Sequence, residues 1–216
     1  SYNQAQFLEE TILSVLNQDY PNIEYIVIDG GSTDGSVEII KKYEHRLAYW
    51  VSERDRGQSH AINKGWQRAT GDIVAYLNSD DLYTPGAITA AVETLLTHRD
   101  ACMVCSDVLL IDEQGDVLRT AKGRPFDIRE VITTENVVRQ PTVFIWRSAL
   151  DSVGLLDERL HMAMDHDLWV RLGLEYAVIY LPGVCLAKAR WHAEAKSAAQ
   201  IDKLPPERRR ILNKLY

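Results

Sequence analysis

Short apolar segments rich in β-branched residues alternate with helical segments over the first hundred residues, and polar loops separate them. The first is residues 23–28, followed by a polar loop at 29–36 and a helical segment at 37–43. Two further apolar segments, 48–51 and 73–77, also end in polar loops. Strands that alternate with helices are typical of α/β domains with a largely parallel sheet. In such sheets ligands bind outside the carboxyl ends of the strands, where these loops lie.

The pattern changes after residue 100. An apolar segment at 102–111, a turn at 112–116 and an apolar segment at 117–120 indicate a β-hairpin. The second half should therefore add mixed or antiparallel strands. Residues 124–138 show no clear periodicity and predict a surface loop or a short helix over the site. The other expected elements are a strand at 177–181 and helices at 7–17, 59–69 and 167–174, near Pro85 and from about Pro206.

Length, composition and charge limit the classes of protein that fit this chain. Its 216 residues suit one domain with a single core, and 46% hydrophobic residues exclude a disordered chain. The net charge of −7 has the wrong sign for a protein that neutralises nucleic-acid phosphates, so we expect no nucleic-acid partner. Three cysteines cannot all pair within one chain, and the sequence shows neither an apolar run of about 18 residues nor an export signal. We therefore expect a cytoplasmic setting.

Aspartates gather in the loops that follow the predicted strands. Asp29 and Asp34 lie in one loop, Asp80 and Asp81 in another, and Asp165 lies farther along the chain. Carboxylates at this edge of a sheet are suited to hold Mg²⁺ or Mn²⁺ together with phosphate oxygens, and so indicate a nucleotide-diphosphate site. The alternative is that each aspartate caps a helix or forms a turn. We favour that interpretation for Asp34 but not for Asp80.

Two common phosphate-binding patterns are absent from the sequence. Neither GxGxxG after a strand nor GxxxxGK[ST] occurs, so phosphates would be held by other means, of which a metal ion is the most direct. His192 is a candidate metal ligand or a buried structural histidine, and the residues alone favour the structural role.

A series of short motifs runs through the chain in a characteristic order. They are SYN (1–3), QDYPN (18–22), IDGGSTDGS (28–36), DRGQSHAINKG (55–65), GDIVAYLNSDD (71–81), QP (140–141), DHDLW (165–169) and RWH (190–192). Together they resemble family 2 of the nucleotide-sugar glycosyltransferases, over residues 1 to about 197. The resemblance implies a GT-A fold, with a Rossmann-like, mostly parallel sheet flanked by helices and a smaller mixed or antiparallel sheet on the acceptor side. Residues 1–100 would form the nucleotide-sugar half of one domain, 101–200 the acceptor and catalytic half, and 201–216 a C-terminal helix.

The resemblance also implies roles for individual residues. Tyr2 and Asp29 would lie beside the nucleobase, and Asn78-Ser79-Asp80 would take the place of the DxD motif, with Asp80 on the metal. Asp165 would be the general base, with Met164 in place of the usual glutamate, and His192 would approach the metal or the diphosphate. Gly30 stands where many relatives carry a second aspartate that reads the base. The other implied donor contacts are Asn3, Arg56, Gln58, Asn63, Asn78, Asp81, Gln140 and Trp169.

The implied reaction moves a sugar, with inversion, from a nucleotide-diphospho-sugar to an acceptor hydroxyl, using Mg²⁺ or Mn²⁺. A UDP-sugar is the favoured donor, and a saccharide or lipid-linked acceptor in polysaccharide or glycolipid biosynthesis of the cell envelope is the favoured partner. We interpret residues 207–210 as a solvated helix face, and the basic segment 208–215 is a candidate for peripheral contact with the inner face of a membrane. Trp146, Trp169 and Trp191 could stack on sugar rings or simply belong to the core.

Two other interpretations stay open. One is an inactive relative that binds nucleotide sugars or carbohydrate. The other is a nucleotidyltransferase, although its usual Gly-rich basic signature near the N-terminus is missing from the sequence.

Overall fold

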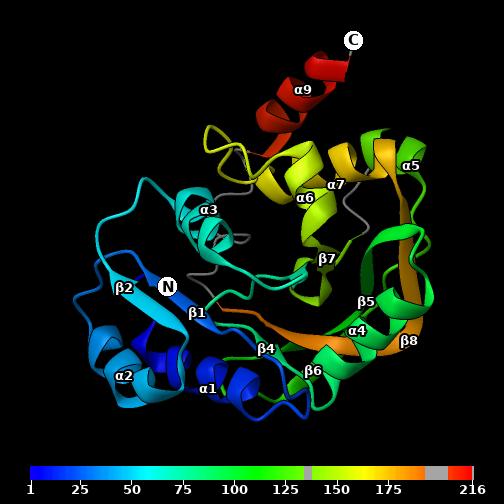
Figure 1. The fold of residues 1–216 in the computed structure, drawn as a ribbon. Helices are drawn as coiled ribbons and strands as arrows, with labels where there is room; N and C mark the ends of the chain where they lie inside the picture. The colour runs from blue at the N-terminus through cyan, green and yellow to red at the C-terminus, as the bar shows by residue number, and fades with distance from the viewer. Residues whose placement is uncertain (134–137, 193–203, 216) are drawn as a thin grey trace.

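Two β-sheets form the centre of the fold, and helices cover them (Figure 1). The structure is a computed structural model that describes residues 1–133, 138–192 and 204–215. In the first sheet, β1 (Ile26–Asp29) pairs in parallel with β2 (Tyr49–Ser52). The first three helices, α1 (Ala5–Leu16), α2 (Ser36–Tyr43) and α3 (Gln58–Arg68), come from the same third of the chain. Leu8, Ile12, Val27 and Ile40 join α1 and α2 to this sheet in one buried cluster.

The second sheet is larger and mixed. Its strand order is β3-β7-β5-β8-β4, and β6 also pairs with β5. The strands are β3 (Ile73–Val74), β4 (Leu82–Tyr83), β5 (Ala101–Ile111), β6 (Val117–Ala121), β7 (Phe144–Trp146) and β8 (Ala177–Arg190). β5 and β8 run parallel, whereas the other pairings of this sheet are antiparallel. The prediction of a largely parallel sheet is therefore wrong, while the predicted hairpin of 102–120 is confirmed.

Short strands and one long strand account for this difference. β4 and β7 contain too few residues to show alternation in the sequence, and the expected strand 73–77 pairs only over Ile73–Val74. β8 continues past its predicted end at Leu181 to Arg190. Pro182 and Gly183 signal the end of a strand, but here Gly183 has a φ of 74° and marks a bend within a continuous strand.

The remaining helices largely follow the predicted pattern. They are α4 (Ala87–Thr97), α5 (Ile128–Thr133), α6 (Arg147–Val153), α7 (Met164–Glu175) and α9 (Leu204–Leu215), with 3₁₀ turns at Glu44–Arg46 and Gln140–Thr142. α6 was not predicted, and α7 begins earlier than predicted, which places Asp165 in its first turn. Residues 134–137 of the expected loop 124–138, and Tyr216, lie outside the described residues. No helix in the described ranges is long and apolar enough to cross a membrane.

The largest core cluster surrounds α7. Leu168, Trp169 and Leu172 are fully buried there, and Ile211 of α9 packs into the same cluster. A second cluster joins α4 to the large sheet through Leu95, Val104 and Leu186.

Candidate active site

The turn that follows β3 is joined to other parts of the chain by amide side chains. Gln58 Nε2 at the start of α3 donates to Asn78 Oδ1 (2.7 Å), and Asn78 Nδ2 donates to Gln140 Oε1 (3.1 Å) and to Asp81 Oδ2 (3.2 Å). Gln140 donates in turn to the carbonyl of Tyr76 (3.0 Å). Four residues predicted from the sequence therefore form one connected group.

Asp80 and His192 meet in the structure, although 112 positions separate them in the sequence. His192 Nε2 lies 3.0 Å from Asp80 Oδ2, and the histidine ring is buried. The neighbouring Asp81 is also buried and accepts a hydrogen bond from the backbone N–H of Arg190 (3.0 Å). Burial, together with the charge of Asp80, raises the pKa of Asp81 to about 7. Negative charge is thus crowded into this turn, next to an imidazole.

These donor atoms fit a divalent cation only in part. Across the described ranges, no three or more His, Cys, Asp or Glu side chains are arranged to hold a metal ion by themselves. Asp80 and His192 supply one carboxylate and one imidazole. Mg²⁺ and Mn²⁺ accept such incomplete protein sites when substrate phosphates and water complete the coordination. An ion at this turn would therefore be bound together with a diphosphate.

Arg190 fixes the same turn from behind, and the sequence analysis did not identify it as a site residue. Its side chain is 1% exposed and donates from Nε to the Asp80 carbonyl (3.1 Å). Its Nη1 donates to the carbonyls of Asp112 (3.1 Å) and Glu113 (2.9 Å), and its Nη2 pairs with Glu10. The only signal in the sequence was its place beside His192.

Asp29 organises the loop that follows β1. Its carboxylate is fully buried and accepts hydrogen bonds from the backbone of Gly31 (3.1 Å), from Ser32 N and Oγ (2.9 and 2.6 Å) and from Ser52 Oγ (2.7 Å). Burial alone would raise its pKa, but the hydrogen bonds from Ser32 and Ser52 outweigh burial and lower it. Asp29 is therefore a charged group directed at its own loop.

The residues before α1 cover this loop. The backbone N–H of Asn3 donates to Ser32 Oγ (2.8 Å), and Asn3 Oδ1 accepts from the backbone of Thr33 (2.9 Å). Tyr2 is 63% exposed, so its ring is accessible to a ligand. Asp34 Oδ1 accepts from Ser36 N (3.1 Å) and Oγ (2.7 Å), which agrees with the turn interpretation, and its Oδ2 accepts from Ala5 N (2.8 Å) at the start of α1.

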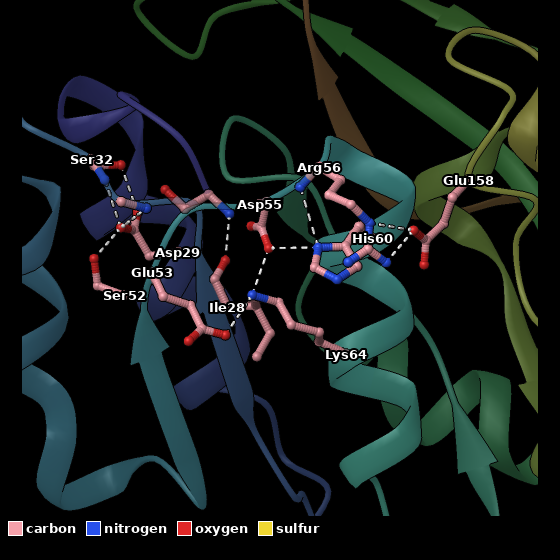
Figure 2. Close-up of polar contacts among 12 residues, drawn as sticks. Ile28, Asp29, Ser32, Ser52, Glu53, Asp55, Arg56, His60, Lys64 and Glu158 are labelled. Atoms are coloured by element: carbon pink, nitrogen blue, oxygen red, sulfur yellow. Dashed lines mark hydrogen bonds and ion pairs between the residues drawn. The ribbon is translucent and has the colours of Figure 1, made fainter.

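A charged cluster beside this loop was missed from the sequence (Figure 2). Lys64 pairs with Asp55 and with Glu53, and His60 Nδ1 lies 3.2 Å from Asp55 Oδ1. A Cβ added to Gly30 would lie 3.3 Å from both Asp55 Oδ2 and the Tyr2 ring. Glycine at position 30 therefore lets the Tyr2 ring and the Asp55 carboxylate approach the backbone closely. The DRGQSHAINKG motif carried the signal, since it contains Asp55, His60 and Lys64.

Arg56 and Asn63 connect α3 to the segment before α7. The exposed Arg56 pairs with Glu158 (2.6 Å, Figure 2). The amide of the buried Asn63 donates to the Leu156 carbonyl (2.9 Å) and accepts from its N–H (3.0 Å). Asn63 is thus occupied in holding the backbone, whereas Arg56 lies at the surface.

Asp165 lies in the first turn of α7 and is partly exposed. Its Oδ1 accepts from the backbone N–H of His166 (2.7 Å), and the positive end of the helix dipole favours the charged carboxylate. Burial, with the charge of Asp165 as a second cause, raises the pKa of Tyr76 well above its usual value. His166 is buried, and its burial together with the charge of Arg208 lowers its pKa to about 4. At neutral pH, Asp165 therefore has a neutral imidazole as its chain neighbour.

The prediction that Trp169 contacts the donor needs correction. Its side chain is fully buried in the α7 core cluster, so no face of the ring is exposed to a sugar. Trp169 lies one helical turn after Asp165 on α7, but its ring packs with Leu168 and Leu172 in the core. Trp191, in contrast, is 54% exposed.

Glu207 departs from the expected solvated face of residues 207–210. Arg209 and Arg210 are exposed as predicted, but Glu207 is 5% exposed. Its carboxylate accepts backbone hydrogen bonds from the segment just before α7. Four consecutive charged residues, 207–210, are typical of a solvated helix face, so the sequence gave no sign that Glu207 binds the backbone before α7.

Comparison with known proteins links this arrangement to one family. The sequence profile of Glycosyl transferase family 2 matches residues 1–151. An uncharacterized glycosyltransferase of Rickettsia typhi is 29% identical over 94% of this chain, and one of Mycobacterium tuberculosis is 32% identical over 81%. The chain spans 65% and 66% of the lengths of these two relatives.

Two solved structures have similar folds. Staphylococcus aureus TarS 1-349 in complex with UDP-GlcNAc matches 89% of this chain and 57% of its own, with a TM-score of 0.72 and 20% identity. The mannosyltransferase PcManGT from Pyrobaculum calidifontis, in complex with GDP-Man and Mn²⁺, matches 92% of this chain and 56% of its own, with a TM-score of 0.67 and 23% identity. These matches show a mixed α/β fold of the GT-A type.

Proposed function

The chain belongs to glycosyltransferase family 2, and on that basis we propose that it transfers a sugar from a nucleotide-diphospho-sugar to an acceptor hydroxyl. The observation that carries this proposal is the contact between Asp80 and His192. Asn78, two residues before Asp80, is hydrogen-bonded to Gln58 and Gln140, and all of these residues belong to the motifs that imply a donor site. The family's chemistry needs a group that holds a diphosphate and a base that accepts a proton. The chain has candidates for both.

The diphosphate would lie at the turn of Asp80 and His192. When bound there, Mg²⁺ or Mn²⁺ would neutralise charge on the leaving nucleoside diphosphate. Asn78 brings no charge, but its amide suits a ribose hydroxyl, as Gln58 and Gln140 hold it in a fixed orientation. The complex of PcManGT with GDP-Man and Mn²⁺ supports the choice of cation.

The nucleobase would lie against Tyr2, whose exposed ring offers a face for stacking. Tyr2 and Asp55 both approach Gly30 closely, which places this carboxylate near the ring. We propose Asp29 as the residue that shapes this pocket from behind, because its own carboxylate is buried and fully hydrogen-bonded. A UDP-sugar is the favoured donor, in keeping with the TarS complex with UDP-GlcNAc, and a GDP-sugar is the alternative.

Asp165 would act as the general base. Inversion requires the acceptor hydroxyl to attack the anomeric carbon opposite the leaving diphosphate while its proton passes to a carboxylate. Asp165 is partly exposed in the first turn of α7, where the helix dipole favours negative charge, so its carboxylate is suited to accept that proton. We propose a saccharide or lipid-linked acceptor, with envelope polysaccharide or glycolipid as the product.

Thermal-shift measurements with UDP-GlcNAc, GDP-mannose and the corresponding dTDP- and CDP-sugars, each with and without Mn²⁺, test the donor site. We expect a rise in Tm with one nucleotide only when Mn²⁺ is present. The rise should be lost in Asp80→Ala and kept in the control Asp151→Ala, which removes an exposed carboxylate on α6. No shift with any donor would overturn the proposal.

Product analysis separates the competing activities. Release of a nucleoside diphosphate from the stabilising donor supports glycosyl transfer. A binding relative would show the shift without release, and a nucleotidyltransferase would exchange pyrophosphate instead. Either result would overturn the proposed reaction.

A further inference from the structure

The carboxylate of Glu207 on α9 is bound by three consecutive backbone amides. Its Oε1 accepts from His161 N (2.9 Å), and its Oε2 accepts from Met162 N (2.8 Å) and Ala163 N (2.8 Å). Glu207 is 5% exposed. Figure 1 shows α9 beside the loop that connects α6 to α7. A segment near the end of the described chain is therefore bonded to the backbone that immediately precedes Asp165.

This carboxylate binds the backbone amides of the two residues before the N-cap of α7 and of the N-cap residue itself. Ala163 is the N-cap of α7 and has no side chain that can cap the helix. Three successive N–H groups directed at one anion form a concave binding site for negative charge, and the helix dipole adds to it. The three backbone hydrogen bonds outweigh burial and lower the pKa of Glu207. Glu207 is thus charged and anchors the backbone that enters α7.

The opposite side of the same segment is held by α3. Ser59 Oγ lies 3.2 Å from the Leu160 carbonyl and 2.8 Å from Met164 Sδ, and it has a single proton to donate. This hold is weak, because thioether sulfur is a poor acceptor. Charge-assisted hydrogen bonds such as those of Glu207 are roughly twice as strong as neutral ones. The α9 side therefore dominates the placement of residues 161–163.

Ile211 gives α9 a fixed position from which Glu207 can act. It is buried in the core cluster that surrounds α7, one helical turn after Glu207. Arg208 lies on the same side, close enough for its charge to contribute to the lowered pKa of His166. The profile match of the family ends at residue 151, so this helix lies beyond it.

We infer that Glu207 is a positioning residue for the reaction, since it fixes the backbone of residues 161–163 and thereby the place of the Asp165 carboxylate. The inference rests on the proposed role of Asp165 as the base. Glu207 should affect proton transfer and not donor binding, because none of the residues proposed for the donor site lies in residues 161–163. Displacement of a reacting group by about 1 Å can lower turnover roughly a hundredfold.

Kinetics and amide hydrogen exchange of Glu207→Gln test the inference. The substitution keeps the shape of the side chain but turns one oxygen into an N–H donor that faces a backbone N–H. We expect kcat for Mn²⁺-dependent nucleotide release from UDP-GlcNAc or GDP-mannose to fall by about 10–100-fold, with KM for the donor changed less than about twofold. Exchange at residues 161–163 should become faster, while exchange at Leu168–Leu172 should not change.

Two further variants make the result decisive. Glu207→Asp retains the charge on a shorter side chain and should lie between wild type and Glu207→Gln, while Arg209→Ala on the exposed face should behave as wild type. Unchanged kcat in Glu207→Gln, or unchanged exchange at 161–163, would overturn the inference. Asp165→Asn is measured in parallel. If its turnover is unchanged the proposed base is wrong, whereas the exchange data still report the Glu207 contact independently.

Discussion

Replacing Arg190 with Met removes the guanidinium that holds the Asp80 turn, and the free energy of unfolding should fall by the energy of the contacts that are lost. The guanidinium makes four hydrogen bonds, each worth about 1.5–3 kcal/mol for a charged donor. Most of this hydrogen-bond energy is not lost in the variant, because Glu10 and the Glu113 backbone lie at the surface, where water can hydrogen-bond to them in place of the arginine. Water cannot replace two other interactions, the hydrogen bond to the Asp80 carbonyl and the cation–π contact with the Phe7 ring, whose centroid lies 4.7 Å from the guanidinium carbon. Their energies are therefore lost in the variant.

These terms predict that Arg190→Met lowers the free energy of unfolding by about 2–4 kcal/mol. Met fills most of the apolar volume, and removal of a buried charge returns part of its desolvation cost, so we do not expect a larger value. For a chain of this size the change in Tm should be a decrease of roughly 6–12 °C.

Calorimetry and urea unfolding of three variants provide the assay. Arg190→Lys keeps the charge but cannot reach acceptors on separate turns, so it should lose about half as much stability as Arg190→Met. Arg210→Ala on the exposed face of α9 is the control and should match wild type. A Tm of Arg190→Met within about 2 °C of wild type would refute the reasoning.

Three other predictions follow from the site. Asp165→Asn should lower turnover by about 10²–10⁴-fold with the donor-induced thermal shift unchanged, and normal turnover would exclude it as the base. Asn63→Ala loses two hydrogen bonds with the Leu156 backbone and should cost about 1–3 kcal/mol in urea unfolding, and a neutral result would contradict the contact. The pKa of His166 falls from about 6.5 to about 4 on folding, chiefly through burial, so the unfolded chain takes up a proton first as the pH drops. Stability should therefore decline from about pH 6.5 towards pH 4, by up to about 3 kcal/mol, and His166→Gln should flatten this slope of Tm against pH; equal slopes would count against the assignment.

Long elements with clear periodicity could be predicted from the sequence. The helices near 7–17, 59–69 and 167–174 and the hairpin of 102–120 appear close to their expected places. The mixed pairing of the large sheet could not be predicted, because strands of two or three residues show no periodicity in the sequence. Such strands form only where a partner strand is already in place.

The site shows the same division between local and distant information. Gln58, Asn78, Asp81 and Gln140 come from separate motifs and form one hydrogen-bonded group, while their contact with a donor stays a prediction. Asn63 and Trp169 also lie in motifs that imply donor contacts. However, the Asn63 amide binds the Leu156 backbone, and the Trp169 ring is buried in the core. Residue type alone does not distinguish these cases, since the difference depends on which side of a helix faces the neighbouring layer.

The pairing of Asp80 with His192 depends on the two features that the sequence concealed. β4 pairs antiparallel with β8, with Leu82 opposite Lys188. Continuing this register by two residues brings Asp80 opposite Arg190, which explains why the arginine binds its carbonyl and why His192 reaches its carboxylate. Had β8 ended at Leu181 as predicted, neither contact could form. A strand of two residues, paired with the extension of another strand beyond a proline and a glycine, therefore determines the geometry of the proposed diphosphate site.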